Sequence, residues 1–225
     1  MIHLVIFDLD GTLLDTIADL GAACNHALAS CGLPTHAPEE YPRLVGNGIN
    51  RLIERALPKE YTALGEEERT RQVMRVRKEF VPYYNAHNCD FTHPYEGITD
   101  VLEALKKKGI RLAVASNKYH EATLHIVRHF FGNTFDCVYG EREGIPRKPD
   151  PQIVRDILQA ANIQENGVAQ NTLYVGDSLV DIETARRAGV PVAACTWGFA
   201  SREELTAARP DFIIDSPPEI IALTE

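Results

Sequence analysis

Residues 4–12 read LVIFDLDGT, and this stretch decides the fold because an apolar block ends abruptly in two aspartates, a glycine and a threonine. A short, wholly apolar run is typical of a strand buried on both faces of a parallel sheet. Such a strand delivers Asp8 and Asp10 to the open edge of the sheet, where ligands bind. Side chains at i and i+2 point the same way, so the two carboxylates converge there if extended geometry persists to Asp10.

The chain is acidic: its 225 residues include 23 Lys and Arg against 32 Asp and Glu, for a formal charge of −9. That balance argues against nucleic acid or an anionic membrane as a partner, since both need clustered cations. The five cysteines are widely spaced and form no CxxC pair, which favours reduced thiols and a cytoplasmic location. With no membrane-span or signal-peptide pattern in the sequence, we expect a soluble, unprocessed protein.

The region between the first strand and residue 86 has a helical pattern throughout. Helices are expected near residues 16–32, 38–46, 48–57 and 66–86, and no strand pattern appears between residues 13 and 110. This region is too long for one crossover connection between strands. We therefore expect residues 16–85 to form a helical domain inserted after the first strand.

Strands and helices alternate regularly from residue 97 onward. Helices are expected near 98–108, 119–131, 151–161, 179–188, 202–208 and 217–223, and strands at 111–115, 136–139, 172–175, 191–195 and 211–214. Repeated strand–helix units predict an α/β fold, a doubly wound, Rossmann-like parallel sheet with helices on both faces. Residues 1–15 and 86–225 would form this core domain.

Polar side chains follow several of the predicted strands, at the edge where ligands of doubly wound sheets bind. They comprise several aspartates, one hydroxyl, one amide and two lysines. One lysine lies on the connection after strand 136–139, just before a helix begins. The residues concerned are Asp8, Asp10, Ser116, Asn117, Lys118, Lys148, Asp177 and Asp181.

Four clustered carboxylates are costly without a counterion, since each pair at ~5 Å repels by about 3 kcal/mol at an effective dielectric of ~20. We therefore expect a divalent cation among them. Oxygen-only ligands select a hard ion, and Mg²⁺ is the hard ion that works beside phosphates. A cation together with Lys148, Ser116 and free backbone N–H groups makes a site for a dianion, which phosphate fits.

The motifs, in this order and spacing, resemble those of the haloacid dehalogenase-like hydrolase superfamily: D-x-D-G-T at 8–12, S-N at 116–117, K-P at 148–149 and G-D-S-x-x-D at 176–181. The helical insertion resembles that superfamily's four-helix cap. P-Y-E-G-I at 94–98, S-N-K at 116–118 and T-W-G-F at 196–199 are most similar to its phosphoglycolate phosphatase group. The resemblance covers the whole chain. It implies a Mg²⁺-dependent phosphomonoester hydrolase acting on 2-phosphoglycolate or a similar small acidic phosphate.

The resemblance also implies the roles of the aspartates. Asp8 would be the nucleophile that forms an aspartyl-phosphate, and Asp10 the general acid that later serves as base. Mg²⁺ would be held by the Asp8 carboxylate, the Asp10 main-chain carbonyl and Asp177. The superfamily's dehalogenases lack an aspartate at the position of Asp10, so its presence favours phosphate chemistry. Thr12 favours a phosphatase over the sugar-phosphate mutases.

The remaining core residues would handle the transferring phosphoryl group. Ser116, Asn117 and Lys148 would bind its oxygens. Asp181 would orient Lys148 or a metal-bound water, with Thr12 in a similar supporting position. Lys118 could be a second cation in the cleft, or an ordinary charged side chain.

Substrate choice would reside in the helical insertion. The Gly-Asn-Gly sequence around Asn47 resembles the cap loop that faces the active site, and Arg51, one turn on, could bind a substrate carboxylate bidentately. The alternative is a tight turn between helices with a solvated Arg51. Trp197 is expected to pack structurally. The expected partner is a small-molecule phosphate ester, and the protein would be a monomer or homodimer.

Two other enzymatic functions fit the same scaffold, namely an inorganic pyrophosphatase and a sugar-phosphate mutase similar to β-phosphoglucomutase. A non-enzymatic alternative is a phospho-acceptor module similar to the receiver domains of signalling proteins. Receivers also place acidic residues and a lysine at strand ends. They are about half this length, lack a helical insertion and carry no second acid two residues after the acceptor, which counts against that alternative.

Overall fold

The computed structural model describes residues 1–62, 65–161 and 171–225, which divide into two compact units. The larger unit comprises Met1–Asp15 and His93–Glu225, and the smaller one Thr16–Thr92. Within the described ranges, no helix is long and apolar enough to cross a membrane.

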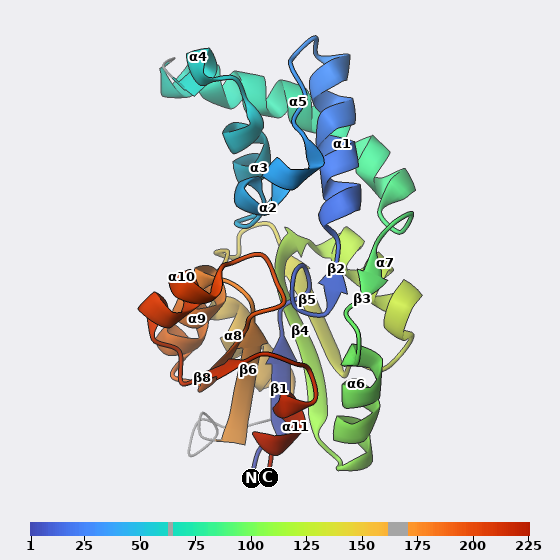
Figure 1. Cartoon of the computed structure of the whole chain (residues 1–225), viewed down its shortest axis with the longest axis vertical. Helices are drawn as coiled ribbons and strands as arrows, with labels where there is room; N and C mark the ends of the chain where they lie inside the picture. The colour runs from blue at the N-terminus through green and yellow to red at the C-terminus, as the bar shows by residue number, and fades with distance from the viewer. Residues whose placement is uncertain (63–64, 162–170) are drawn as a thin grey trace. The chain divides into compact units, whose positions relative to one another are not determined.

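The larger unit is built on six parallel strands in the order β5–β4–β1–β6–β7–β8 (Figure 1). β1 lies between β4 and β6, and all four of its residues are buried, as the apolar run at residues 4–7 predicts. Each of the six expected strands is present. Their bounds are β1 (Leu4–Phe7), β4 (Arg111–Tyr119), β5 (Cys137–Glu141), β6 (Thr172–Gly176), β7 (Val192–Cys195) and β8 (Phe212–Ile214).

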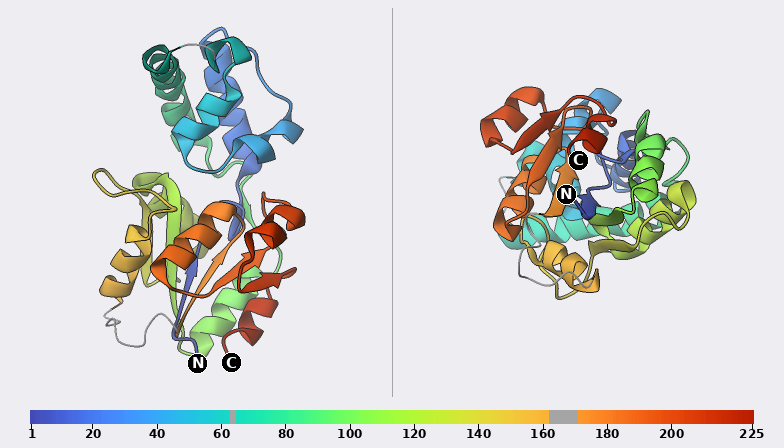
Figure 2. Two further views of the ribbon diagram at one scale, coloured as in Figure 1. Left: turned by 90° about the vertical axis from the view of Figure 1, so that its left-hand side faces the viewer. Right: turned by 90° about the horizontal axis from the view of Figure 1, so that it is seen from below.

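Helices cover both faces of this sheet (Figures 1 and 2). One face carries α6 (Ile98–Lys107), α7 (His120–Phe131) and α11 (Glu219–Ala222), and the other carries α8 (Gln152–Ala160), α9 (Leu179–Ala188) and α10 (Arg202–Ala208). The doubly wound parallel fold is therefore confirmed. Because the chain runs from β4 outward to β5 and from β6 outward to β8, the switch in direction lies at β1, and ligands bind beyond such a point.

The smaller unit is helical. It contains α1 (Ile17–Ser30), a 3₁₀ turn η1 (Pro38–Glu40), α2 (Tyr41–Leu44), α3 (Ile49–Ala56), α4 (Lys59–Thr62) and α5 (Glu66–His87). The long helix α5 packs against α1 and α3. The helix expected at 38–46 is replaced by η1 and the short α2, because Pro42 lacks the N–H that a continuous helix would donate to the Pro38 carbonyl. The short helix α4 was not expected.

Two short strands occur in the region where no strand was expected. Both belong to the larger unit, at the points where the chain leaves it and returns to it. β2 (Leu14–Asp15) pairs antiparallel with β3 (His93–Pro94). Two-residue strands have no periodicity that a sequence could reveal. The smaller unit extends to Thr92, beyond the boundary expected at residue 85, because the Asp19 carboxylate of α1 accepts hydrogen bonds from Thr92 N at 2.9 Å and Oγ1 at 2.7 Å.

Candidate active site

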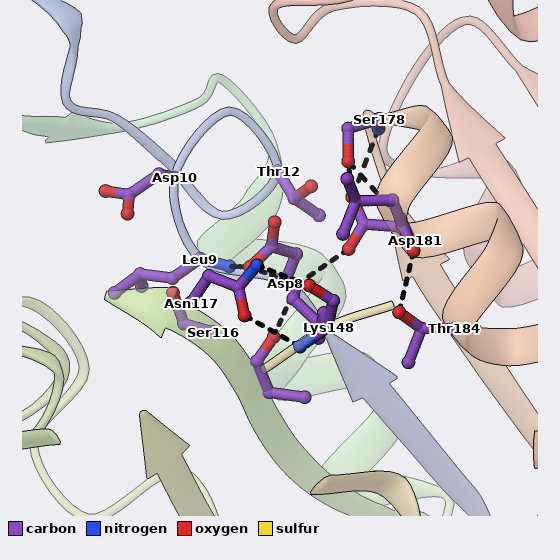
Figure 3. Close-up of polar contacts among 12 residues, drawn as sticks. Asp8, Leu9, Asp10, Thr12, Ser116, Asn117, Lys148, Ser178, Asp181 and Thr184 are labelled. Carbon is purple, nitrogen blue, oxygen red and sulfur yellow. Dashed lines mark hydrogen bonds and ion pairs between the residues drawn. The ribbon is translucent and has the colours of Figure 1, made fainter. Parts of the chain in front are cut away.

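The turn after β1 directs the side chains of Asp8 and Asp10 to different sides. Asp8 still continues the ladder, since its N–H donates to Val175 O at 2.9 Å. The chain then turns at Gly11, whose φ is +87°, and the Leu13 and Leu14 N–H groups both donate to Leu9 O. Figure 3 shows the Asp8 side chain directed toward Lys148 and the Asp10 side chain directed away. The expectation that the two carboxylates converge is wrong, because extended geometry ends before Asp10.

Lys148 is the centre of the buried cluster. Its side chain is 2% exposed, and Nζ lies 2.7 Å from Asp181 Oδ1 and 3.0 Å from Asp8 Oδ1. Nζ also donates to Ala115 O at 2.9 Å and to the Tyr174 hydroxyl at 3.1 Å. Four oxygens therefore surround one ammonium group. This arrangement fixes Lys148 beside the Asp8 carboxylate.

Asn117 holds the main chain of Lys148 in place. The Lys148 N–H donates to Asn117 Oδ1 at 2.9 Å, and Asn117 Nδ2 donates to Lys148 O at 3.1 Å (Figure 3). Both ends of the Asn117 amide thus contact the backbone of the lysine loop. These contacts support the lysine loop. Binding of phosphate oxygens by Asn117 stays a prediction.

Three aspartates from β1 and from the β6–α9 segment meet at the sheet edge. Asp8, Asp177 and Asp181 each offer a carboxylate oxygen, and these atoms all lie within 4.8 Å of one another. Asp181 is fully buried and forms a capping box with Ser178 at the start of α9. Its other oxygen, Oδ1, accepts a hydrogen bond from Lys148 Nζ at 2.7 Å. Asp10 lies outside this group.

The buried cluster contains three carboxylates and one lysine, so acidic groups outnumber basic ones. Burial and the neighbouring Asp181 raise the pKa of Asp8 well above its usual range, although Lys148 opposes the shift. The same two causes raise the pKa of Asp177 to about 7. Burial lowers the pKa of Lys148, but Asp181 and Asp8 outweigh burial and raise it overall. Three buried carboxylates facing one lysine form the hard, oxygen-rich environment that fits a divalent cation.

Asp10 pairs with Lys118 instead of joining the carboxylate cluster. Lys118 Nζ lies 2.7 Å from Asp10 Oδ1, and the two side chains are 3% and 18% exposed. Ser116 is also buried, and its hydroxyl accepts the Lys118 N–H at 3.1 Å. Asp10 follows β1, whereas Ser116 and Lys118 lie in the last residues of the neighbouring strand β4, where its register with β5 becomes irregular after Ala115. The S-N-K motif at residues 116–118 therefore contains the lysine that pairs with Asp10.

Several residues of the site were not identified from the sequence. The Tyr174 hydroxyl on β6 donates to Asp181 Oδ1 at 3.0 Å. A single phenol within an otherwise apolar strand was an available signal, because a buried Tyr hydroxyl needs a partner. The Phe199 N–H donates to Asp177 Oδ2 at 2.8 Å, and Trp197 Nε1 donates to Thr12 O at 3.1 Å. Every residue except proline has a main-chain N–H, so the identity of residue 199 does not indicate this donor.

The predicted specificity residues of the smaller unit lie in and after the turn between α2 and α3. Asn47 has a φ of +65° and accepts a hydrogen bond from Arg55, which also donates to Leu44 O and Val45 O. Arg51 is 62% exposed and forms an ion pair with Glu54 at 2.5 Å. The loop is thus an ordered interhelical turn held by Arg55. Contact of Asn47 or Arg51 with a substrate stays a prediction.

Comparisons with known proteins agree with this geometry. The family model described as haloacid dehalogenase-like hydrolase matches residues 5–195. The phosphoglycolate phosphatase of Aquifex aeolicus is 30% identical over 228 residues, covering 99% of this chain and 97% of that protein. The phosphoglycolate phosphatase of Mesorhizobium japonicum is 34% identical over 200 residues, covering 88% and 85%. A solved structure from Lactobacillus delbrueckii subsp. bulgaricus has a TM-score of 0.89 at 32% identity, covering 99% and 98%.

The matched segment contains every motif of the buried cluster, from Asp8 through Lys148 to Asp177 and Asp181. The relative from Aquifex aeolicus and the solved structure from Lactobacillus delbrueckii match over nearly their whole length, and the latter shares the fold. The chain therefore belongs to the haloacid dehalogenase-like hydrolase family, among its phosphatases.

Proposed function

We propose that this protein is a Mg²⁺-dependent phosphomonoester hydrolase that works through an aspartyl-phosphate and acts on 2-phosphoglycolate or a similar small acidic phosphate. The observation that carries the proposal is the buried Asp8 carboxylate, 3.0 Å from Lys148 and within reach of Asp177 and Asp181. The names of the relatives from Aquifex aeolicus and Mesorhizobium japonicum support the choice of substrate.

Asp8 is the proposed nucleophile. One of its carboxylate oxygens forms a bond to phosphorus while the ester P–O bond breaks, which leaves the phosphoryl group on Asp8 and an alkoxide on the departing product. Lys148 and the Ser116 hydroxyl stabilise the charge on the transferring oxygens by position. The carboxylates of Asp8 and Asp177 and the main-chain carbonyl of Asp10 would hold Mg²⁺, which would supply positive charge next to the phosphoryl oxygens.

Asp10 is the proposed proton carrier. It donates a proton to the departing alkoxide. It then takes a proton from the water that attacks phosphorus, while the bond between Asp8 and phosphorus breaks, which frees the Asp8 carboxylate and releases inorganic phosphate. This division of roles needs the Asp10 carboxylate to be separate from the metal ligands, and its orientation away from Asp8 is consistent with that requirement. Lys118 holds the carboxylate in this orientation at 2.7 Å.

The location and assembly of the enzyme are also part of the proposal. All five cysteines are free thiols, which supports a cytoplasmic location. A monomer or homodimer remains our prediction for the oligomeric state.

A panel of phosphate compounds tests the proposed function. Inorganic phosphate release is measured with 2-phosphoglycolate, ethyl phosphate, pyrophosphate and β-glucose 1-phosphate, in Mg²⁺ and in EDTA. We expect Mg²⁺-dependent release with the highest kcat/KM for 2-phosphoglycolate. Absence of metal-dependent turnover on every compound overturns the proposal. Turnover of pyrophosphate alone identifies a pyrophosphatase, and conversion of the hexose 1-phosphate to its 6-phosphate without net phosphate release identifies a mutase.

Lys118 tests the preference for acidic substrates. Its buried ammonium is the cation that a substrate carboxylate could share with Asp10. We expect Lys118→Met to reduce kcat/KM for 2-phosphoglycolate by about 10- to 100-fold more than for ethyl phosphate, the value of one charge-assisted hydrogen bond. The exposed Lys107→Met is the matched control. Equal losses on both substrates would show that Lys118 acts on Asp10 alone.

The pKa of Asp177 predicts how pH and Mg²⁺ affect stability. Because the folded protein raises this pKa to about 7 from 3.8, the folded state binds the proton more tightly than the unfolded state, and stability falls as pH rises from about 4 to about 7. Mg²⁺ replaces that proton, so it stabilises more at pH 8 than at pH 5.

Thermal melts in Mg²⁺ and in EDTA measure this difference. The rise in Tm caused by Mg²⁺ should be larger at pH 8 than at pH 5 by at least about 4 °C, which is ~1 to 2 kcal/mol for a chain of this size. Asp177→Asn should abolish most of the difference. An equal Mg²⁺ effect at both pH values contradicts the assignment of Asp177 as a metal ligand.

A further inference from the structure

We propose that the loop at residues 196–199, between β7 and α10, positions Asp177 for metal binding, and that Gly198 is the residue on which this depends. The loop would set the affinity for Mg²⁺ without touching the metal or the substrate. This inference rests on the proposed function in one respect, namely that Asp177 is a metal ligand. Three independent features of the larger unit support it.

Main-chain and side-chain donors fix both oxygens of Asp177. The Phe199 N–H donates to Oδ2 at 2.8 Å, and the Thr12 hydroxyl donates to Oδ1 at 2.8 Å. Asp177 is only 1% exposed, so bulk solvent has little access to this carboxylate. With one donor on each oxygen, the remaining lone pairs are left for the side shared with Asp8 and Asp181.

Trp197 connects the same loop to the turn after β1. Its Nε1 donates to Thr12 O at 3.1 Å, on the residue whose hydroxyl donates to Asp177. The loop therefore reaches Asp177 directly through Phe199 and indirectly through Thr12. Outer hydrogen bonds of this kind orient metal-binding carboxylates, and their loss typically weakens metal binding by about 10- to 100-fold.

Two glycines enclose the Asp177 side chain. A Cβ atom at Gly11 would lie 2.7 Å from Asp177 Cγ, and one at Gly198 would lie 2.5 Å from Asp177 Cγ and would also overlap the Gly11 carbonyl oxygen. Gly11 is needed for its positive φ as well. Gly198 is not among the residues with positive φ, so close approach to Asp177 is the reason for glycine there.

Gly198→Ala is consequently a direct test of positioning. The added methyl group has to displace either the Asp177 side chain or the loop that donates to it, because the distance to Asp177 Cγ is far below a normal contact. Gly65→Ala is the matched control, since a Cβ there meets nothing within 4 Å and Gly65 lies in the smaller unit.

The chain supplies its own reporter for the measurement. Trp197 is the only tryptophan, so fluorescence excited at the long-wavelength edge, where the eight tyrosines absorb little, reports on this loop. Titration of the wild-type protein with MgCl₂ should give a saturable change in fluorescence without any substrate present. We expect Gly198→Ala to raise the apparent Kd for Mg²⁺ by at least about 10-fold. Gly65→Ala should leave it unchanged. Turnover of Gly198→Ala should recover substantially as MgCl₂ is increased, which a merely misfolded variant would not do.

A second variant covers the case in which Gly198→Ala fails to fold. Trp197→Phe keeps an aromatic ring while it removes the donor to Thr12, and its Mg²⁺ binding is followed by calorimetry. We expect a Kd at least about threefold above that of the wild type. If a folded variant binds Mg²⁺ as the wild type does, the positioning role is overturned and the proposed function stands. If the wild-type protein itself binds no Mg²⁺, both are overturned.

Discussion

Asp8→Asn is expected to lower turnover of 2-phosphoglycolate by at least about 10⁴-fold, because the amide cannot attack phosphorus and, among the residues that the structure describes, no other carboxylate occupies its place at the end of β1. Asp10 cannot substitute, since its side chain is directed away and paired with Lys118. Steady-state phosphate release measures the effect. The exposed Asp100→Asn on α6 is the matched control and should be as active as the wild type.

The loss should not come from unfolding. Burial and Asp181 raise the pKa of Asp8, so ionised Asp8 destabilises the metal-free fold at pH values above its usual pKa. A neutral asparagine of the same size relieves that repulsion. We therefore expect the Tm of Asp8→Asn in EDTA at pH 8 to equal or exceed that of the wild type, even though Lys148 loses one contact.

Chemical trapping separates the roles of the two aspartates. Acid quenching with ³²P-labelled substrate should give a hydroxylamine-sensitive label on the wild-type protein and none on Asp8→Asn. Asp10→Asn should retain the label for longer, because water attack lacks its base. Wild-type turnover in Asp8→Asn, or labelling of that variant, contradicts the assignment of the nucleophile.

The sequence predicted the sheet and the position of its ligand edge well, for a physical reason. A strand buried on both faces needs only apolar residues, so residues 4–7 and 172–175 are recognisable without tertiary information. The parallel order then places the residues after these strands at one edge. Lys148, Asp177 and Asp181 lie there as predicted, brought together by backbone topology.

Features that depend on local turn geometry were beyond the sequence. The hydrogen bonds of the turn around Gly11 set the direction of the Asp10 side chain. If the strand had stayed extended as far as Asp10, this side chain would point the same way as that of Asp8. The β2–β3 ladder has only two residues on each strand, too few for a periodic pattern. The donor to Asp177 Oδ2 is the Phe199 main chain, which any residue except proline could supply.

Lys148→Met is expected to cause the largest loss of stability in the site, together with loss of activity. Lys148 Nζ contacts four oxygens in a side chain that is 2% exposed, and methionine fills the volume while removing the charge. Asp8 and Asp181 then lack their cation. Breaking a buried ion pair in this way typically costs about 3 to 5 kcal/mol. In a chain of this size the Tm should fall by about 6 to 20 °C.

The pH dependence distinguishes this explanation from a simple packing defect. Lys148 is the cation that lowers the pKa of Asp8, so removing it lets the pKa of Asp8 rise further. Protonation of Asp8 then relieves part of the buried negative charge, and this relief is greater at low pH than at high pH. The Tm difference between Lys148→Met and the wild type, measured in EDTA, should therefore be larger at pH 8 than at pH 5. Lys107→Met should show no difference at either pH. An equal loss at both pH values would assign the effect to packing, and the charge balance of the three carboxylates would have to be reconsidered.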